Sequence, residues 1–138
     1  MNEATLSPTG KPLGALASDA PLDPKAKYNG RKVNVQYVPP ALIAACSEAL
    51  DEGRIKYGCA KWRETKTEMM TYLGGVLRHI YSYIDGEDLD PESLTGKTHL
   101  AGAVASLAIL LDGIAMGNIV DNRPPKGPVG LFRMKEAK

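Results

Sequence analysis

The sequence predicts an all-α fold, because apolar residues recur at helical spacing in three long segments. These segments cover about residues 40–57, 66–84 and 98–116. The chain has 138 residues, of which 43% are hydrophobic and 24% are charged, so it is long enough for one globular domain with a modest core. Its net charge of +1 gives no general attraction to nucleic acid or to an anionic membrane.

Both ends of the chain are predicted to be irregular. Residues 1–27 and 122–138 are rich in proline and glycine, and the second stretch ends in basic residues. Residues 32–38 alternate weakly between apolar and polar side chains and could form one extended segment, which cannot make a sheet alone. We therefore expect a flexible or surface-draped arm over residues 1–27, a helical domain over 28–121 and an irregular tail over 122–138.

Proline and glycine set the predicted limits of the first helix. Pro39 and Pro40 suit its first turn, where the fixed φ of proline is tolerated, and Gly58 is a natural terminator. The second helix contains Gly74 and Gly75, which cost up to about 1 kcal/mol each relative to alanine. Such a pair indicates the close approach of another helix or of a ligand.

The third helix is predicted to begin after Thr98, which is a good N-cap residue. It is apolar or small on nearly every side, so we expect it to be the central helix, and a partner subunit could help to bury it.

Cys46 and Cys59 are too few for a disulfide framework, which favours a reducing compartment. We find no signal peptide and expect no membrane span, so we expect a cytoplasmic protein.

The segment between the second and third helices carries the densest charge. The chain's only two histidines, His79 and His99, flank it. Clustered carboxylates repel one another, so such a loop is favoured when solvent, cations or a bound metal offset the repulsion. Five acidic residues lie within eight positions there: Asp85, Glu87, Asp88, Asp90 and Glu92.

Several metal sites can be weighed from this pattern. An EF-hand is excluded, because starting from Asp85 or Asp88 the required glycine and final glutamate are missing. Zinc is disfavoured, because His79 and His99 stand alone and neither cysteine lies near them in the sequence. Oxygen ligands instead favour Mg²⁺ or Mn²⁺. A solvated acidic turn is the alternative interpretation.

Two further residues also have a structural and a functional interpretation. His79 could bind a neighbouring carbonyl group or act in catalysis. Trp62, the only tryptophan, could close the core between the first two helices or stack on a nucleobase. The pattern alone favours the structural interpretation for both residues.

Several short motifs follow one another along the chain. They are Pro39-Pro40, Lys56-Tyr57-Gly58 followed by Trp62, Arg78-His79, Gly86-Glu87 leading to Asp90-Pro91-Glu92-Ser93, and His99-Leu100-Ala101. In these motifs and their order, the chain resembles the dATP/dGTP diphosphohydrolases of phages and bacteria, a family of small all-α relatives of the MazG pyrophosphohydrolases. The resemblance covers about residues 28–112.

The sequence departs from the family pattern at several positions. Lys61 stands where asparagine is common, Ala103 where histidine is frequent, and Ser106 where asparagine is frequent. About two extra residues lie between Ser93 and His99. The third helix also lacks the ExxD motif that carries metal ligands in MazG relatives, so we expect the ligands in the acidic loop.

The resemblance implies a MazG-like helical bundle that hydrolyses a purine deoxynucleoside triphosphate, dGTP or dATP, to the monophosphate and pyrophosphate. It also implies Mg²⁺, which Mn²⁺ can replace, a homo-oligomer (dimer or tetramer), and a role in making 2-aminoadenine nucleotides for phage DNA. The alternatives are a general house-cleaning pyrophosphatase and a non-catalytic helical interaction module. We expect catalysis by His79, Glu87 and His99, phosphate binding by Lys56, Lys61 and Arg78, base binding by Tyr57 and Trp62, and metal binding by Glu87, Asp90 and Glu92.

Overall fold

The computed structural model describes residue 21 and residues 23–135, so most of the predicted N-terminal arm lies outside the described residues. The chain divides into two units, one ending at Tyr37 and one beginning at Val38, and each is described by itself.

The described part of the first unit contains two short helices. The α-helix α1 spans Pro24–Asn29, and the 3₁₀ turn η1 spans Val35–Tyr37. Asp23 caps α1 by accepting a hydrogen bond from the backbone of Lys25 at 2.9 Å. The extended segment predicted over residues 32–38 is wrong, because the backbone there forms local hydrogen bonds and no described strand pairs with it.

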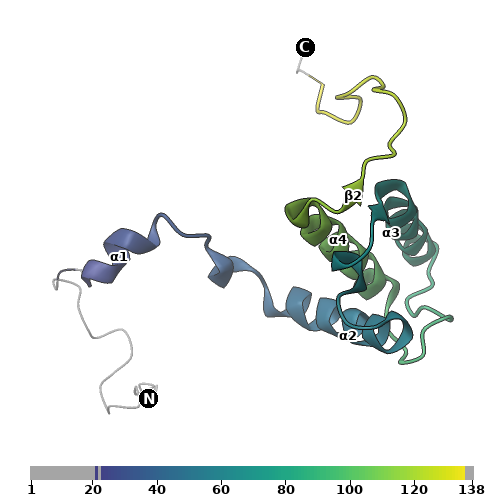
Figure 1. The fold of residues 1–138 in the computed structure, drawn as a ribbon, viewed down its shortest axis with the longest axis horizontal. Helices are drawn as coiled ribbons and strands as arrows, with labels where there is room; N and C mark the ends of the chain where they lie inside the picture. Colours follow the sequence, from purple (N-terminus) through teal and green to yellow (C-terminus); the bar gives the residue numbers. More distant parts are fainter. Residues whose placement is uncertain (1–20, 22, 136–138) are drawn as a thin grey trace, which may run out of the picture. The chain divides into compact units, whose positions relative to one another are not determined.

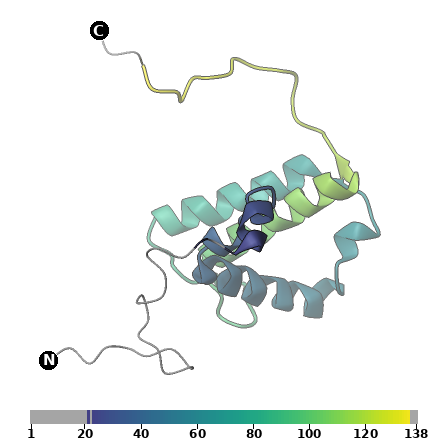
Figure 2. The same cartoon turned by 90° about the vertical axis from the view of Figure 1, so that its left-hand side faces the viewer.

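Three long helices form the second unit, and the predicted all-α fold is confirmed. They are α2 (Pro40–Tyr57), α3 (Met69–Ile84) and α4 (His99–Met116). Both α2 and α3 pack against α4, which is therefore central, as predicted (Figures 1 and 2). The short 3₁₀ turn η2 (Lys61–Arg63) follows α2. Thr98 caps α4 by accepting a hydrogen bond from the backbone of Ala101 at 3.1 Å.

A two-stranded parallel ribbon ties the start of α3 to the end of α4. It consists of β1 (Thr67–Glu68) and β2 (Ile119–Val120). The side chain of Ile119 packs so closely on Gly113 that a Cβ there would lie 2.5 Å from its Cδ1 atom. The sequence did not predict this ribbon, because two-residue strands carry no periodic signal.

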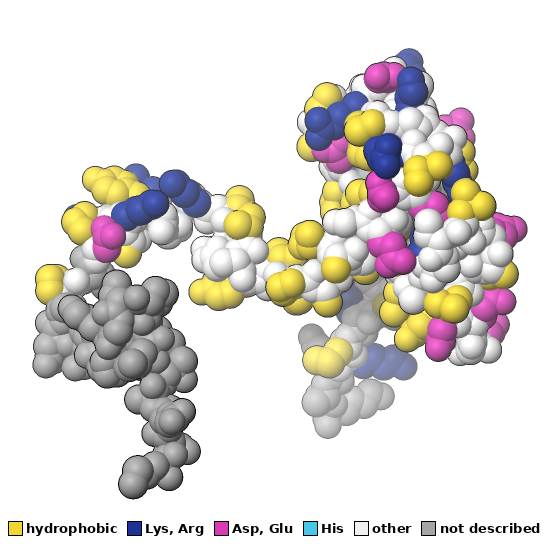
Figure 3. All heavy atoms as spheres, turned by 90° about the horizontal axis from the view of Figure 1, so that it is seen from below, with side chains coloured by type: hydrophobic (Ala, Val, Ile, Leu, Met, Phe, Trp, Pro, Cys, Tyr) yellow, Lys and Arg dark blue, Asp and Glu magenta, His cyan; other side chains and the backbone are white. Residues whose placement is uncertain are grey.

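Small residues dominate the core around α4. Ala49, Ala101 and Ala105 form its buried cluster, which allows the helix backbones to approach closely. Several large hydrophobic side chains remain exposed on the outer faces, including Leu111 at 69%, and hydrophobic side chains appear between charged ones on the surface of Figure 3. Among the described helices, α4 alone is long and apolar enough to cross a membrane, a test that the core helix of a soluble protein also passes.

Candidate functional site

A pocket of about 350 Å³ lies between α2, α3, α4 and the loop that joins α3 to α4. Its wall carries three carboxylates, three ammonium groups, three aromatic rings and one imidazole. The carboxylates belong to Glu52, Asp90 and Glu92, and the ammonium groups belong to Lys56, Lys61 and Lys97. The aromatic rings are those of Tyr57, Trp62 and Tyr72, and the imidazole is that of His79.

The carboxylate of Glu52 is the most deeply buried charge of the pocket, with only 1% of the residue exposed. It forms ion pairs with Lys56 at 3.0 Å and with Lys97 at 3.2 Å. Burial alone would raise the pKa of Glu52, but hydrogen bonds from its neighbours outweigh burial and hold the pKa far below its usual value. Three donors from the loop complete its shell: Ser93 Oγ at 2.8 Å, the Leu94 amide at 2.9 Å and Thr95 Oγ1 at 3.1 Å.

Sequence reasoning missed Glu52, although its spacing carried a signal. It comes three residues after Ala49 and seven after Ala45. This helical spacing places it on the face of α2 that packs against the core. A glutamate on the small-residue face of a helix must find partners when it is buried. Lys56 lies one turn later on the same face, and it is the first of those partners.

Lys97 joins the two buried carboxylates of the pocket. Its ammonium group lies 3.3 Å from Asp90 Oδ2, in addition to its ion pair with Glu52, and its side chain is only 11% exposed. Asp90 Oδ1 accepts a hydrogen bond from the Glu92 amide at 2.9 Å. Burial acts to raise the pKa of Asp90, but these hydrogen bonds and the nearby charge of Lys97 lower it overall. Asp90 is therefore ionised at neutral pH.

Backbone pairing carries Asp90 into the interior. Leu89 and Thr98 form an isolated antiparallel bridge, and the Asp90 amide donates to the Lys97 carbonyl at 3.0 Å. The His99 amide donates to the Asp88 carbonyl at 3.0 Å. The acidic loop is therefore held as a narrow turn, which buries one of its five carboxylates while the others stay exposed.

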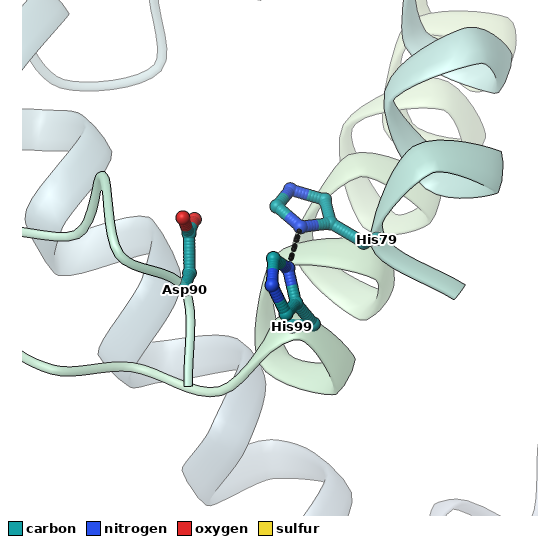
Figure 4. A group of neighbouring side chains, drawn as sticks. All are labelled: His79, Asp90 and His99. Atoms are coloured by element: carbon teal, nitrogen blue, oxygen red, sulfur yellow. Dashed lines mark hydrogen bonds between the residues drawn. The ribbon is translucent and has the colours of Figure 1, made fainter. Parts of the chain in front are cut away.

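Two histidines and a glutamate form a hydrogen-bonded chain beside Asp90. His79 on α3 and His99 at the start of α4 place their Nδ1 atoms 2.8 Å apart. Figure 4 shows the two rings with this contact drawn between them. The Nε2 atom of His99 lies 2.7 Å from Glu87 Oε1. Burial is the main cause that lowers the pKa of His79, so its imidazole is neutral at neutral pH. The fold thus brings together two imidazole rings that lie 20 positions apart in the sequence.

Trp62 is fixed in the pocket wall by a polar contact with α4. Its indole Nε1 donates to Asp112 Oδ2 at 2.7 Å, and Arg63 binds both oxygens of the same carboxylate at 2.8 Å. These hydrogen bonds, first from Arg63 and then from Trp62, lower the pKa of Asp112 to about 2. The half-buried indole is therefore held against α4 and also borders the pocket.

The structure brings most of the sequence-predicted residues to one place. The pocket wall holds the predicted phosphate ligands Lys56 and Lys61, of which Lys61 also pairs with Glu64 at 2.8 Å. Arg78 instead extends along α3, where its guanidinium lies near Gly74. Five other predicted residues also border the pocket: Tyr57, Trp62, His79, Asp90 and Glu92.

Glu87 and His99 lie behind this wall rather than in it, linked to His79 by the hydrogen bonds described above. Sequence reasoning missed Lys97, whose basic side chain within an acidic loop was the available signal. It also gave no role to Tyr72, which lines the pocket from α3 together with His79.

Comparison with known proteins assigns the chain to a family. The family described as dATP/dGTP diphosphohydrolase, N-terminal, matches residues 23–123, which include all three long helices and the whole pocket. No curated protein and no solved structure matches the chain. The matched residues make up most of the chain, so it belongs to the dATP/dGTP diphosphohydrolase family and is a nucleoside triphosphate pyrophosphohydrolase.

Proposed function

We propose that the pocket between α2, α3 and α4 binds dGTP or dATP and, with Mg²⁺, releases the monophosphate and pyrophosphate. The observation that carries this proposal is the charge of the pocket wall. Three carboxylates and three ammonium groups face one cavity, so their charges cancel. A triphosphate brings several further negative charges, and divalent cations are needed to balance them.

The carboxylates available for such a cation are Asp90 and Glu92. Both line the pocket, and the two oxygens of Asp90 each make one hydrogen bond, which leaves lone pairs for a metal. Mg²⁺ is commonly bound by one or two carboxylates together with substrate phosphates, and Asp90 and Glu92 provide two such carboxylates. When bound, the ion would polarise a phosphoryl oxygen and lower the pKa of a coordinated water. Glu87, the third predicted ligand, serves in this proposal to orient His99.

Lys56 and Lys97 are proposed to bind the phosphate oxygens. Glu52 holds both ammonium groups at the pocket wall, and its hydrogen bond raises the pKa of Lys56, which keeps that group charged. Fixed positive charges beside the leaving pyrophosphate stabilise the negative charge that develops there. Glu52 is therefore a positioning residue that acts through the two lysines.

The aromatic side of the pocket is proposed to receive the purine. Tyr57, Trp62 and Tyr72 line it, and the hydrogen bond to Asp112 restricts the rotation of the indole. A preorganised ring loses little conformational freedom when a base stacks on it. Stacking accepts either purine, so the choice between dGTP and dATP depends on hydrogen bonds to the base edge.

From the resemblance, we further propose that the product dGMP feeds synthesis of 2-aminoadenine nucleotides in a phage-infected cytoplasm, and that the enzyme acts as a homo-oligomer. The exposed hydrophobic side chains on α3 and α4 support association between subunits.

The proposal is tested with a panel of deoxynucleotides and ribonucleotides, incubated with Mg²⁺ or with EDTA, with separate detection of pyrophosphate and orthophosphate. We expect pyrophosphate from the purine deoxynucleotides and none in EDTA. Asp90→Asn should lower kcat by about a hundredfold or more, since it removes a metal ligand, whereas the exposed Asp88→Asn control should not. Equal turnover of all nucleotides would support the general house-cleaning enzyme instead.

A further inference from the structure

His79, Asp90 and His99 bring three potential metal-binding atoms to one point. One atom from each residue lies within 4.8 Å of the other two. The planes of the two imidazole rings are inclined by 50° to each other, and the ring centroids lie 5.1 Å apart. The rings are therefore not stacked, and their Nδ1 atoms face each other (Figure 4). The three residues come from α3, the loop and α4, so the packing of the fold holds them together.

The hydrogen bond to Glu87 independently prepares His99 to bind a metal. An ionised carboxylate can only accept hydrogen bonds, so His99 Nε2 carries the hydrogen at the 2.7 Å contact. In the neutral tautomer of His99, Nδ1 is then unprotonated, and its lone pair faces His79 Nδ1 at 2.8 Å. Metal-binding histidines usually donate their other ring N–H to a carboxylate in this way.

His79 can become the second nitrogen ligand without gaining or losing charge. Only one hydrogen fits between the two Nδ1 atoms at the 2.8 Å contact, and with His99 in that tautomer, His79 Nδ1 donates it. A cation at this point would replace that hydrogen, which the neutral imidazole of His79 can carry on Nε2 instead. The Nε2 atom lies against Gly102, where an added Cβ would approach to 2.7 Å, so only glycine leaves room for this ring.

We infer that His79 Nδ1, His99 Nδ1 and a carboxylate oxygen of Asp90 form a site for a divalent transition metal such as Mn²⁺, Co²⁺ or Zn²⁺, with Glu87 orienting His99. Imidazole nitrogen favours these ions over Mg²⁺. Because His79 and Asp90 also line the pocket, the open side of the ion would face the substrate, as in metal sites with three protein ligands. This site shares Asp90 with the proposed Mg²⁺ site. Binding of an ion to it can nevertheless be measured without any nucleotide, and so independently of the proposed activity.

The test is a titration of the full, EDTA-stripped chain with Co²⁺ in the absence of nucleotide, followed by visible absorption and by calorimetry. We expect one tightly bound Co²⁺ per chain with visible d–d bands, and no displacement by excess Mg²⁺. Replacing a carboxylate that orients a metal ligand weakens metal binding by about 10–100-fold, which is the loss expected for Glu87→Gln. Asp85→Asn, an exposed carboxylate of the same loop, should bind like the wild type.

His79→Ala should abolish the visible bands, and its melting curve will establish whether it is folded. The side chain of Glu87 is 52% exposed, so we expect Glu87→Gln to fold. This variant therefore still tests the inference if His79→Ala unfolds. The inference is overturned if the wild type shows no saturable Co²⁺ binding, if Glu87→Gln binds as tightly as Asp85→Asn, or if thiolate charge-transfer bands place the ion on Cys46 or Cys59. Loss of nucleotide hydrolysis alone would not bear on it, because this titration contains no substrate.

Discussion

Replacing Glu52 by glutamine should destabilise the protein more than any other single charge-removing change in the pocket. The side chain keeps its shape, but Lys56 and Lys97 lose the buried negative charge that balances them. Removing one partner of a buried ion pair costs about 3–5 kcal/mol, and glutamine should fall near the lower limit because it can still accept from the loop. For a domain of this size, such a loss lowers Tm by about 10 °C or more.

The pH dependence supplies a second measurement of the same effect. The pKa of Glu52 is lower in the folded protein than its ordinary value of 4.5, so the stabilisation is complete above that value. It is lost as the pH falls through the folded pKa, because the unfolded chain then binds the proton more readily. The difference in unfolding free energy between wild type and Glu52→Gln should therefore shrink as the pH is lowered below about 4.5.

Thermal and urea unfolding, followed by circular dichroism from neutral to acidic pH, measure both quantities. Glu48→Gln is the matched control, because Glu48 is an exposed glutamate on the same helix and should change stability by no more than about 0.5 kcal/mol. The reasoning is refuted if Glu52→Gln unfolds like Glu48→Gln, or if the difference between Glu52→Gln and wild type does not change with pH.

Three further predictions follow from the pocket and the two units. Trp62→Ala should raise KM several-fold or more, since a stacked base contributes about 1–3 kcal/mol, whereas Trp62→Phe should retain most of the affinity. If Trp62→Ala and the wild type have equal KM values, Trp62 does not bind the base. Lys56→Gln should raise KM and lower kcat, while the exposed Lys66→Gln should not, and equal kinetics would exclude phosphate binding by Lys56. Residues 38–135 should fold alone, because this unit contains the three long helices and every pocket residue, and a chain without helical circular dichroism would contradict this.

The sequence predicted the helices well because their signals are local. The predicted limits of α2 and α4 agree with the structure to within one residue. The start of α3 differs by three residues, because Thr67 and Glu68 leave the helical pattern to pair with Ile119 and Val120. That pairing joins segments more than fifty positions apart, and neither segment shows it by itself.

Most residues that the sequence suggested for the site line the pocket or lie beside it, but the sequence did not predict how they contact one another. Spacing along the chain identified the acidic loop and both histidines, yet it could not show that Ser93 binds Glu52 across 41 positions or that His79 meets His99 across 20. Burial distinguishes the carboxylates of the loop: Asp90 is buried, whereas its four acidic neighbours are exposed. Burial depends on how three helices pack, and composition alone does not contain that information.

Hydrolysis of dGTP in oxygen-isotope-labelled water tests the central claim most directly. We propose that pyrophosphate is released by attack of water on the α-phosphorus. This attack breaks the bond between the α-phosphorus and the oxygen that bridges it to the β-phosphorus, so the heavy oxygen should enter dGMP and leave pyrophosphate unlabelled. Mass spectrometry of the two products after a single turnover measures this. Label in dGMP alone, formed only when Mg²⁺ is present, is the result that we expect. Label in pyrophosphate, or in released orthophosphate, would place the attack at another phosphorus and contradict the proposed mechanism.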